Sequence, residues 1–318
     1  MQPHVYLLNN VSRLLGLQVW IVREDLYALH GIGGSKARKL ERILESARLR
    51  SSTDLVTVGT TGSHHIHAAS IMGSARNLTV HAILLPQPEL PYAKYIHEQT
   101  RDINKNLTYV QNAWQAAVTM HRVYRNLQRS GRRPYFILPG GSNPDGVAAY
   151  ADAACSIHRR IAEDSKMSGT IDYQVCVLGT GGITAGLVSA ARLQKLPAIH
   201  AVQVYPGFWN NTLYIQSMAW LSRFKSRRAQ RAKDVDSDAN RERRKYDVTL
   251  NIDGNFLGDG YGTLNPLCEE AVSMFEQDNI FLDPIYMARA GQSLIHLARS
   301  RIKPRGLLFW YTAPGIRP

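Results

Sequence analysis

The chain has 318 residues and a mass of 35.6 kDa; 44% of its residues are apolar and 20% are charged. These proportions exclude a generally disordered, collagen-like or coiled-coil chain, and the length suffices for two ordinary domains. The net charge of +13 raises nucleic acid as a partner. However, residues 223–245 contain ten Lys or Arg and four Asp or Glu, a local net +6, so the excess is concentrated in one segment.

The cysteine pattern and the N-terminus indicate a cellular location. Cys155, Cys176 and Cys268 lie far apart, which is neither a disulfide framework nor a CxxC metal signature. No apolar run approaches the roughly 20 residues that span a bilayer, and residues 1–6 lack the pattern of a signal peptide. We therefore expect a cytoplasmic protein without a membrane span.

Short β-branched and aromatic segments alternate with segments of helical period along the chain. This alternation predicts an α/β protein with parallel sheets. Residues 223–245 are expected to form an exposed helix and a loop. In chain order the predicted elements are a strand at 18–22, a helix at 36–49, a strand at 54–58, a helix at 63–75, a strand at 79–85, a helix at 92–101, a strand at 107–110, a helix at 114–129, a strand at 135–138, a helix at 146–162, a strand at 173–178, a helix at 184–193, strands at 200–205 and 247–252, helices at 265–277 and 287–301, and a strand at 306–311.

Glycine clusters lie where predicted strands meet predicted helices, at 31–34, 59–62, 140–141 and 179–182. Ligands of doubly wound sheets bind at the carboxyl ends of strands, where such turns lie. The cluster at 179–182 leads into a helix of small residues, whose first backbone N–H groups favour an anion such as a phosphate. The dinucleotide fingerprint GxGxxG is incomplete, because Thr184 occupies its third glycine position. A tight turn without a ligand is the alternative.

Lys36 follows two glycines and begins a predicted helix, where the helix dipole disfavours a positive charge. A lowered pKa suits a lysine that forms a Schiff base with a carbonyl compound. The alternative is a solvated lysine on a basic helix that also carries Arg38, Lys39 and Arg42.

The turn at 59–65 offers the Ser63 hydroxyl and free backbone N–H groups to a carboxylate. Helix capping without a ligand is again the alternative. Three nearby histidines also suggest a metal, but the side chains of His64 and His65 diverge on a helix, and His67 alone completes no ligand set. We predict no metal site.

Together these blocks resemble the pyridoxal-phosphate enzymes of the tryptophan-synthase-β fold, fold type II, and within them the D-cysteine desulfhydrase and 1-aminocyclopropane-1-carboxylate deaminase group. The blocks follow the family's order over nearly the whole chain. The family pattern KREDL…GGNKxRKLE corresponds to VREDL at 22–26 and GGSKARKLE at 33–41, GxxQSNH to GTTGSHH at 59–65, GGSxxLG to GGSNPDG at 140–146, the phosphate loop to 179–186, GYG to 260–262, LDPVY to LDPIY at 282–286, and HTGG to YTAPG at 311–315.

The resemblance implies two three-layer α/β domains with parallel or mixed sheets and the cofactor cleft between them. It assigns residues 1–45 and 155–318 to a large domain that binds pyridoxal 5′-phosphate, and 46–154 to a small domain. It also implies a homodimer and a small amino acid as substrate. Nucleic acid is not an expected partner, because acidic residues interrupt the basic segment 223–245, but binding through that segment stays the alternative from another class of function.

The resemblance also assigns the cofactor-binding residues. Lys36 binds the cofactor as a Schiff base and moves the substrate proton, and Lys39 lies near the cofactor phosphate. His64 replaces an asparagine that contacts the ring hydroxyl, and Thr312 faces the pyridine nitrogen. The phosphate is expected on the backbone N–H groups of Gly179, Thr180, Gly181, Gly182 and Ile183.

On the substrate side, the resemblance places Ser63 and the backbone amides of His64 and His65 at the carboxylate, with Tyr261 and Tyr286 lining the pocket. Lys36, Ser63, Tyr261 and Tyr286 are thus the predicted catalytic residues. An imidazole titrates near neutral pH, so we expect the charge of His64 to couple to the cofactor.

Two departures bear on the reaction. Met287 stands where the deaminase group has glutamate, and Thr312 stands where that group lacks threonine, which disfavours opening of a cyclopropane ring. A hydroxyl at the pyridine nitrogen favours β-elimination or β-replacement. The sequence therefore predicts a lyase that acts by β-elimination through Lys36; a β-replacement synthase or a deaminase-like enzyme is the alternative.

Overall fold

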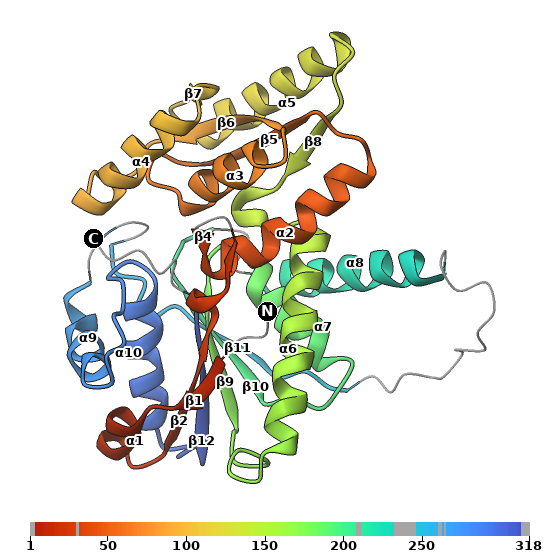
Figure 1. Ribbon diagram of the computed structural model, residues 1–318. Helices are drawn as coiled ribbons and strands as arrows, with labels where there is room; N and C mark the ends of the chain where they lie inside the picture. Colours follow the sequence, from red (N-terminus) through yellow and green to blue (C-terminus); the bar gives the residue numbers. More distant parts are fainter. Residues whose placement is uncertain are drawn as a thin grey trace.

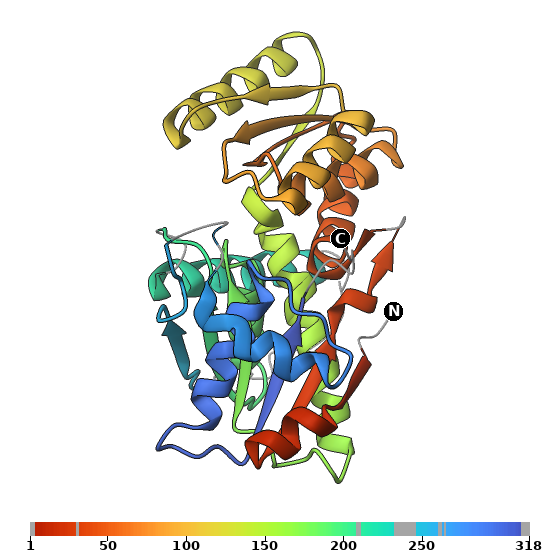
Figure 2. The same ribbon diagram turned by 90° about the vertical axis from the view of Figure 1, so that its left-hand side faces the viewer.

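The computed structural model describes residues 4–29, 32–207, 211–231, 246–259, 263 and 265–312, and of 226–231 only the backbone. Its elements build two separate sheets, one above the other in Figures 1 and 2, with helices on both faces of each. This arrangement confirms the predicted α/β fold class. The lower sheet in these views is called the large sheet, and the upper one the small sheet.

The large sheet has six strands in the order β1-β2-β12-β9-β10-β11. Its first pair is antiparallel and the others are parallel. Fully buried Ile21, Val175, Phe309 and Trp310 lie in its centre. The strands are β1 (His4–Leu7), β2 (Gln18–Arg23), β9 (Tyr173–Leu178), β10 (Ala198–Gln203), β11 (Leu250–Asp253) and β12 (Gly306–Tyr311).

The small sheet has four parallel strands in the order β7-β6-β5-β8. A separate two-stranded ribbon precedes the first long helix. The small-sheet strands are β5 (Asp54–Thr60), β6 (Thr79–Leu85), β7 (Leu107–Tyr109) and β8 (Pro134–Ile137), and the ribbon consists of β3 (Ala28–Leu29) and β4 (Ile32–Gly33).

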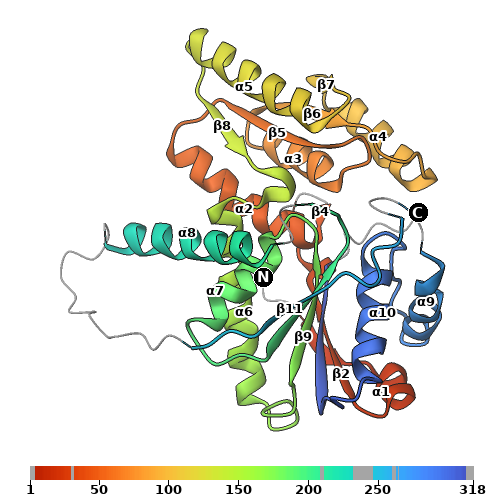
Figure 3. The ribbon, with the colours of Figure 1, turned by 180° about the vertical axis from the view of Figure 1, so that it is seen from behind.

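Helices cover both faces of each sheet. On the large sheet, α6 (Pro144–Glu163), α7 (Gly182–Ala191) and α8 (Thr212–Arg231) lie on one side, as the view from behind in Figure 3 shows, and α1 (Asn9–Leu15), α9 (Glu269–Glu276) and α10 (Met287–Ala298) lie on the other. On the small sheet, α2 (Gly34–Leu49), α3 (His64–Ser74) and α4 (Pro91–Ile103) lie opposite α5 (Ala113–Arg129). The described residues also form the short 3₁₀ helices η1 (Glu24–Leu26), η2 (Pro139–Gly141) and η4 (Pro266–Cys268).

Each predicted strand and helix overlaps an element of the structure, but some elements escaped prediction. β1 has four residues at a sheet edge, and α1 has seven residues of which only Val11 is buried, so neither has a clear apolar period. Gly16 ends α1 in the left-handed conformation, with φ 68°. α8 begins at Thr212, well before the charged segment in which we expected a helix.

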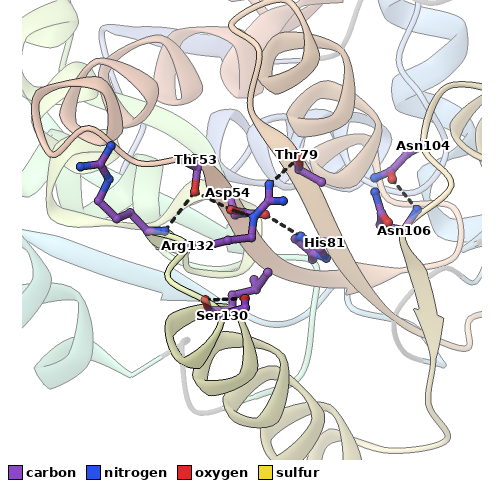
Figure 4. Close-up of polar contacts among 10 residues, drawn as sticks. Thr53, Asp54, Thr79, His81, Asn104, Asn106, Ser130 and Arg132 are labelled. Atoms are coloured by element: carbon purple, nitrogen blue, oxygen red, sulfur yellow. Dashed lines mark hydrogen bonds and ion pairs between the residues drawn. The ribbon is translucent and has the colours of Figure 1, made fainter.

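Asp54 joins β5 and β6 to the loop before β8, at the edge of the small sheet where the strands begin (Figure 4). Its fully buried carboxylate accepts hydrogen bonds from Arg132 Nε and Thr53 Oγ1, both at 2.6 Å, and lies 2.9 Å from His81 Nε2. Burial raises the pKa of Asp54, but the hydrogen bonds from Arg132, Thr53 and His81 outweigh burial and leave the pKa below its ordinary value. The cluster fixes the register of the small sheet far from the carboxyl ends of its strands.

We predict that Asp54→Asn lowers the free energy of unfolding at pH 7 by about 1–3 kcal/mol, because charged hydrogen bonds are lost in a buried place. The folded pKa of Asp54 lies below the unfolded value of about 3.9. Its stabilisation is therefore present above pH ~3.9 and is lost as the pH falls through the folded pKa. Urea unfolding at pH 7 and at stepwise lower pH measures the difference, which should shrink toward acid.

Asp152→Asn is the matched control. Asp152 also pairs with an arginine, Arg42, but its side chain is 73% exposed, so its removal should change the free energy of unfolding by less than about 1 kcal/mol. Equal stability of Asp54→Asn and wild type at pH 7 would show that the Asp54 cluster does not stabilise the sheet.

Candidate active site

A cavity of about 480 Å³ lies between the two sheets. Its walls come from the carboxyl ends of parallel strands, namely β5, β6 and β8 of the small sheet and β9, β10 and β12 of the large one. This is where ligands bind in open α/β sheets. All four predicted glycine clusters supply residues to its lining, namely Gly33, Gly59, Gly140 and the turn at 179–182.

Three helices begin at the cavity, and together they make it attractive to anions. α2 begins at Gly34, α3 at His64 and α7 at Gly182, and the residue before each helix makes no side-chain cap hydrogen bond. The first backbone N–H groups of a helix have no partner within the helix, and the helix dipole adds positive potential there. A phosphate or a carboxylate is the group that such ends bind.

Lys36 lies in the first turn of α2 and lines the cavity. Burial lowers the pKa of Lys36 to about 8, although the negative charge of Asp283 opposes the shift. Its Nζ lies 3.5 Å from Ser35 Oγ. This position does not match a solvated lysine on a basic helix, and the lowered pKa makes a larger fraction of the Lys36 side chain reactive amine near neutral pH than in an ordinary lysine.

Lys39 lies one turn further along α2 and is buried. Its ammonium donates a hydrogen bond to the carbonyl oxygen of Gly140, which joins α2 to η2. Burial lowers the pKa of Lys39 well below its ordinary value, and the charge of Lys36 lowers it further. Two lysines therefore lie together at the end of the cavity where the helices begin.

The turn between β9 and α7 forms the wall of the cavity that faces these lysines. Gly181 has φ 79°, a conformation that favours glycine. A Cβ on Gly179 would meet nothing closer than Val204, at 3.8 Å, so the absence of a side chain leaves open space in the cavity wall. The turn is tied to η2 by a 2.7 Å hydrogen bond between Thr180 and Ser142.

Ser63 precedes α3 and lines the cavity, as His64 and His65 do. The buried His65 imidazole lies with Nε2 2.9 Å from Thr57 Oγ1, which holds its ring against β5. Because Thr57 donates to the carbonyl oxygen of Ile137 at 3.0 Å, His65 Nε2 is the donor toward Thr57. Burial and the charges of Lys36 and Lys39 lower the pKa of His65 well below its ordinary value, so the ring is neutral.

The expectation that His64 changes charge near neutral pH is wrong. Burial, and then the charge of Lys36, lower the pKa of His64 to about 3. Its Nε2 shares a hydrogen bond with the hydroxyl of Tyr92, at the start of α4, and the two rings lie 5.0 Å apart. Burial and the negative charge of Asp283 raise the pKa of Tyr92, so this pair is neutral.

Tyr286, directly before α10, and Thr312, directly after β12, also line the cavity. The Thr312 hydroxyl lies 3.6 Å from Met287 Sδ, a weak acceptor. Tyr261 lies outside the described residues, so its predicted position next to the substrate stays a prediction.

Tyr92 and Asp283 are two polar residues near the cavity that sequence reasoning missed. Asp283 accepts hydrogen bonds from the backbone N–H groups of Ile285, Tyr286 and Met287 at 3.2, 2.8 and 3.1 Å, so it caps α10. Burial raises its pKa. Asp283 lies inside the block LDPIY, which was a usable signal.

The structure describes only part of the segment that we considered for nucleic-acid binding. Of the basic segment 223–245, Lys225 pairs with Asp145 of α6, and the side chains of 226–245 lie outside the described residues. The alternative function, nucleic-acid binding through this segment, therefore stays a prediction. In the part of the chain that the structure describes, no group of three or more metal-ligating side chains is gathered. No helix among the described residues has the length and hydropathy to cross a membrane.

Comparisons with known proteins agree with this geometry. The family model described as pyridoxal-phosphate dependent enzyme matches residues 3–292. The chain is 26% identical over 318 residues to a protein of Pyrococcus abyssi provisionally named a 1-aminocyclopropane-1-carboxylate deaminase, with 97% of this chain and 88% of that protein covered. It is 27% identical over 318 residues to a D-cysteine desulfhydrase of Klebsiella pneumoniae, with 97% and 91% covered.

The fold is similar to that of the crystal structure of an ACC deaminase homologue, with a TM-score of 0.79 and 23% identity. The superposition covers 99% of this chain and 90% of that one. A crystal structure of O-ureido-L-serine synthase is also similar in fold, with a TM-score of 0.62, 12% identity and coverage of 98% and 89%. The described part of the chain therefore shares the fold of these structures.

The neutral imidazole of His64 leads to a prediction about stability and pH. Its folded pKa of about 3 lies below the unfolded value of about 6.5, so the unfolded chain binds the extra proton. The stability that depends on a neutral His64 is complete above pH ~6.5 and is lost as the pH falls toward 3. We expect the free energy of unfolding of His64→Asn to fall less steeply than that of wild type, by up to ~1.4 kcal/mol per pH unit.

Urea unfolding between pH 7 and pH 4.5 measures this difference in slope. His121→Asn, at an exposed position of α5, is the control and should leave the slope unchanged. Parallel pH dependences of wild type and His64→Asn would show that His64 takes up a proton as freely in the folded protein as in the unfolded chain.

Proposed function

Because the chain belongs to the family of pyridoxal-phosphate dependent enzymes, we propose that it is a lyase that acts on an amino acid by β-elimination. The observation that carries this proposal is Lys36, an amine with a pKa lowered to about 8 that faces the cavity between the two sheets. The curated relative named D-cysteine desulfhydrase supports the reaction type.

The residues around the cavity fit pyridoxal phosphate. The open space next to Gly179, which a Cβ would fill, and the uncapped start of α7 suit a phosphate. Thr312 offers a hydroxyl whose neighbour Met287 Sδ is a weak acceptor, so the hydroxyl can donate to a ring nitrogen instead. Lys36 lies on the cavity lining with these groups, as a Schiff-base lysine requires.

We therefore assign the cofactor to the predicted residues. Lys36 would hold its carbonyl carbon, Lys39 and the backbone of 179–183 its phosphate, Thr312 its ring nitrogen, and His64 its ring hydroxyl. The neutral His64 imidazole can donate to that hydroxyl if this contact replaces its hydrogen bond with Tyr92. When bound, the cofactor withdraws electrons from the substrate and makes the proton on Cα acidic.

The remaining chemistry belongs to the side chains of this chain. The start of α3, with the Ser63 hydroxyl and the amides of His64 and His65, binds the substrate carboxylate. Lys36 Nζ takes the proton from Cα; an amine of pKa about 8 is partly unprotonated at neutral pH, as a general base must be. Tyr261 and Tyr286 are the proposed substrate-side residues of the large sheet.

Thr312 and Met287 favour elimination over ring opening. A threonine hydroxyl cannot carry the negative charge with which a carboxylate keeps a ring nitrogen protonated, so a reaction whose leaving group departs promptly is favoured. Position 287, where the deaminase group has glutamate, carries a methionine and therefore no carboxylate. Its side chain is fully buried next to Thr312. The name of the Pyrococcus relative favours ring opening instead, and the relative turnover of a cyclopropane substrate and of β-substituted alanines distinguishes the two reactions.

The proposed domain division, oligomeric state and cellular location follow from the resemblance to the family and from the sequence. We propose residues 1–45 and 155–318 as the large cofactor-binding domain and 46–154 as the small one, because the strands of each sheet fall within one of these two parts. A homodimer is the proposed state, by resemblance to the family. A cytoplasmic location is the proposed one, because the wide spacing of the three cysteines in the sequence is not that of a disulfide framework.

The cofactor assignment predicts a covalent adduct. After reduction of the purified protein with borohydride, peptide mass spectrometry should find a pyridoxyl group on Lys36. Lys36→Ala should lose both the adduct and all turnover, and its free energy of unfolding should stay within about 1 kcal/mol of wild type, because the removed ammonium is disfavoured where it lies. Lys94→Ala, at an exposed position of α4, should keep both. An adduct on another lysine would refute the assignment.

The reaction type predicts the order of substrates. Release of pyruvate and ammonia from D- and L-alanines with a leaving group on Cβ should be at least tenfold more efficient, in kcat/KM, than release of 2-oxobutanoate and ammonia from 1-aminocyclopropane-1-carboxylate. Coupled reduction of the oxo acid measures both. More efficient turnover of the cyclopropane substrate would reverse the interpretation of Met287 and Thr312.

A further inference from the structure

The two ends of the cavity differ in chemistry. Lys36, Ser63, His65 and the glycine turn lie at its polar end, which the cofactor and the substrate carboxylate account for. The other end is built by the small sheet and the first half of α5. We call this end the apolar annex; its lining is Val58, Leu85, Ala116, Ala117, Met120 and Phe136.

The apolar annex is the open end of a hydrophobic core. The space between the small sheet and α5 is filled by a cluster that includes Val56, Ile83 and Val110. Five annex residues belong to this cluster as well, so one set of side chains packs the core and lines the cavity. The shared residues are Val58, Leu85, Ala116, Met120 and Phe136.

The start of α5 is fixed in a way that keeps this end open. Asn112 caps the helix, accepting a hydrogen bond from Gln115 N at 2.9 Å. Trp114 is directed to solvent, with 75% of its surface exposed. Ala113, Ala116 and Ala117 share the opposite stripe, three and four residues apart, and all three line the cavity. A larger side chain at this stripe would fill the annex.

The lining chemistry defines what the annex can hold. None of its six side chains carries a charge or a hydrogen-bonding group of ordinary strength, so a hydrated or ionic group gains nothing there. A leaving group as small as hydrogen sulfide would cover little of this surface. An alkyl or aryl group would remove the apolar surface of the annex from water, and the favourable binding free energy grows with the apolar area covered.

We propose that the apolar annex binds an apolar thioether substituent on the β-carbon of the substrate, so that the enzyme prefers S-alkyl or S-aryl cysteines to free cysteine. This inference rests on the proposed β-elimination. In that reaction the Cα–H and Cβ–S bonds break, and the departing thiolate takes up a proton. Water then hydrolyses the remaining three-carbon fragment to pyruvate and ammonium. One S-substituted cysteine and one water give one thiol, one pyruvate and one ammonium ion.

Turnover of an alkyl series tests the inference in the holoenzyme. S-methyl- and S-propylcysteine of each hand release thiols of nearly equal acidity, so a difference in kcat/KM reports binding of the longer chain. We expect S-propylcysteine to be about tenfold more efficient, because two further methylene groups are buried. Ala117→Phe should remove this preference by filling the annex.

The matched control lies next to it on the same helix. Val118 is exposed and does not line the cavity, so Val118→Phe adds a similar bulk in another direction and should keep the tenfold preference. Equal efficiency of the two substrates in the wild-type enzyme, or the same preference in Ala117→Phe as in wild type, would overturn the inference.

Binding of amino acids that cannot eliminate separates this inference from the proposed function. 2-Aminoheptanoate and norvaline are the carbon analogues of S-propyl- and S-methylcysteine. Calorimetric titration should give an about tenfold lower Kd for 2-aminoheptanoate in wild type and Val118→Phe, and equal values in Ala117→Phe. This result without any pyruvate release would support the annex and refute β-elimination. Pyruvate release with equal Kd values would support β-elimination and refute the annex.

Discussion

The buried ion pair between Glu24 and Arg38 holds the start of α2 in place, and with it both lysines of the cavity. The Glu24 carboxylate is fully buried and accepts from Arg38 Nε at 2.7 Å, from its Nη2 at 3.0 Å and from the Tyr150 hydroxyl at 3.1 Å. Burial alone would lower the pKa of Arg38, but the charge of Glu24 outweighs burial and raises it. Removal of one partner from such a pair leaves an uncompensated buried charge, which costs about 3–5 kcal/mol. The position of α2 therefore tolerates little variation.

The pair acts through a short chain of contacts. Arg38 also lies over the ring of Tyr27, 4.0 Å from its centroid, and Tyr150 belongs to α6, so η1, α2 and α6 are joined around one guanidinium. One residue after Arg38, Lys39 donates to Gly140, and the same loop reaches the glycine turn through Ser142 and Thr180. The lysines and the turn that they face thus belong to one connected unit, although they come from distant parts of the sequence.

Much of the fold follows from sequence pattern, but the details of the site do not. The strands of both sheets are short apolar runs, and the glycines at 59–62 and 179–182 mark the strand ends that meet at the cavity, so the cleft was predictable. The partner of His64 was not: Tyr92 lies 28 residues away in the chain, and only the packing of α4 on α3 brings the two rings together. Burial, which turns His64 from a titrating group into a neutral one, is equally invisible in a list of residues.

The electrostatics of the cavity connect stability with function. Lys36, Lys39 and the starts of three helices place positive charge and positive dipole ends around one space, and burial opposes the charge of each lysine. Burial disfavours the charge of each lysine in this place, so other contacts of the fold must hold them there, and the Glu24–Arg38 pair is one of these contacts. A phosphate and a carboxylate bound in this space would remove the mutual repulsion. Ligands that bind only the folded state also raise its stability. The same arrangement that costs stability in the protein alone therefore selects doubly anionic ligands, and the apolar annex beside it selects what the substrate carries on its β-carbon.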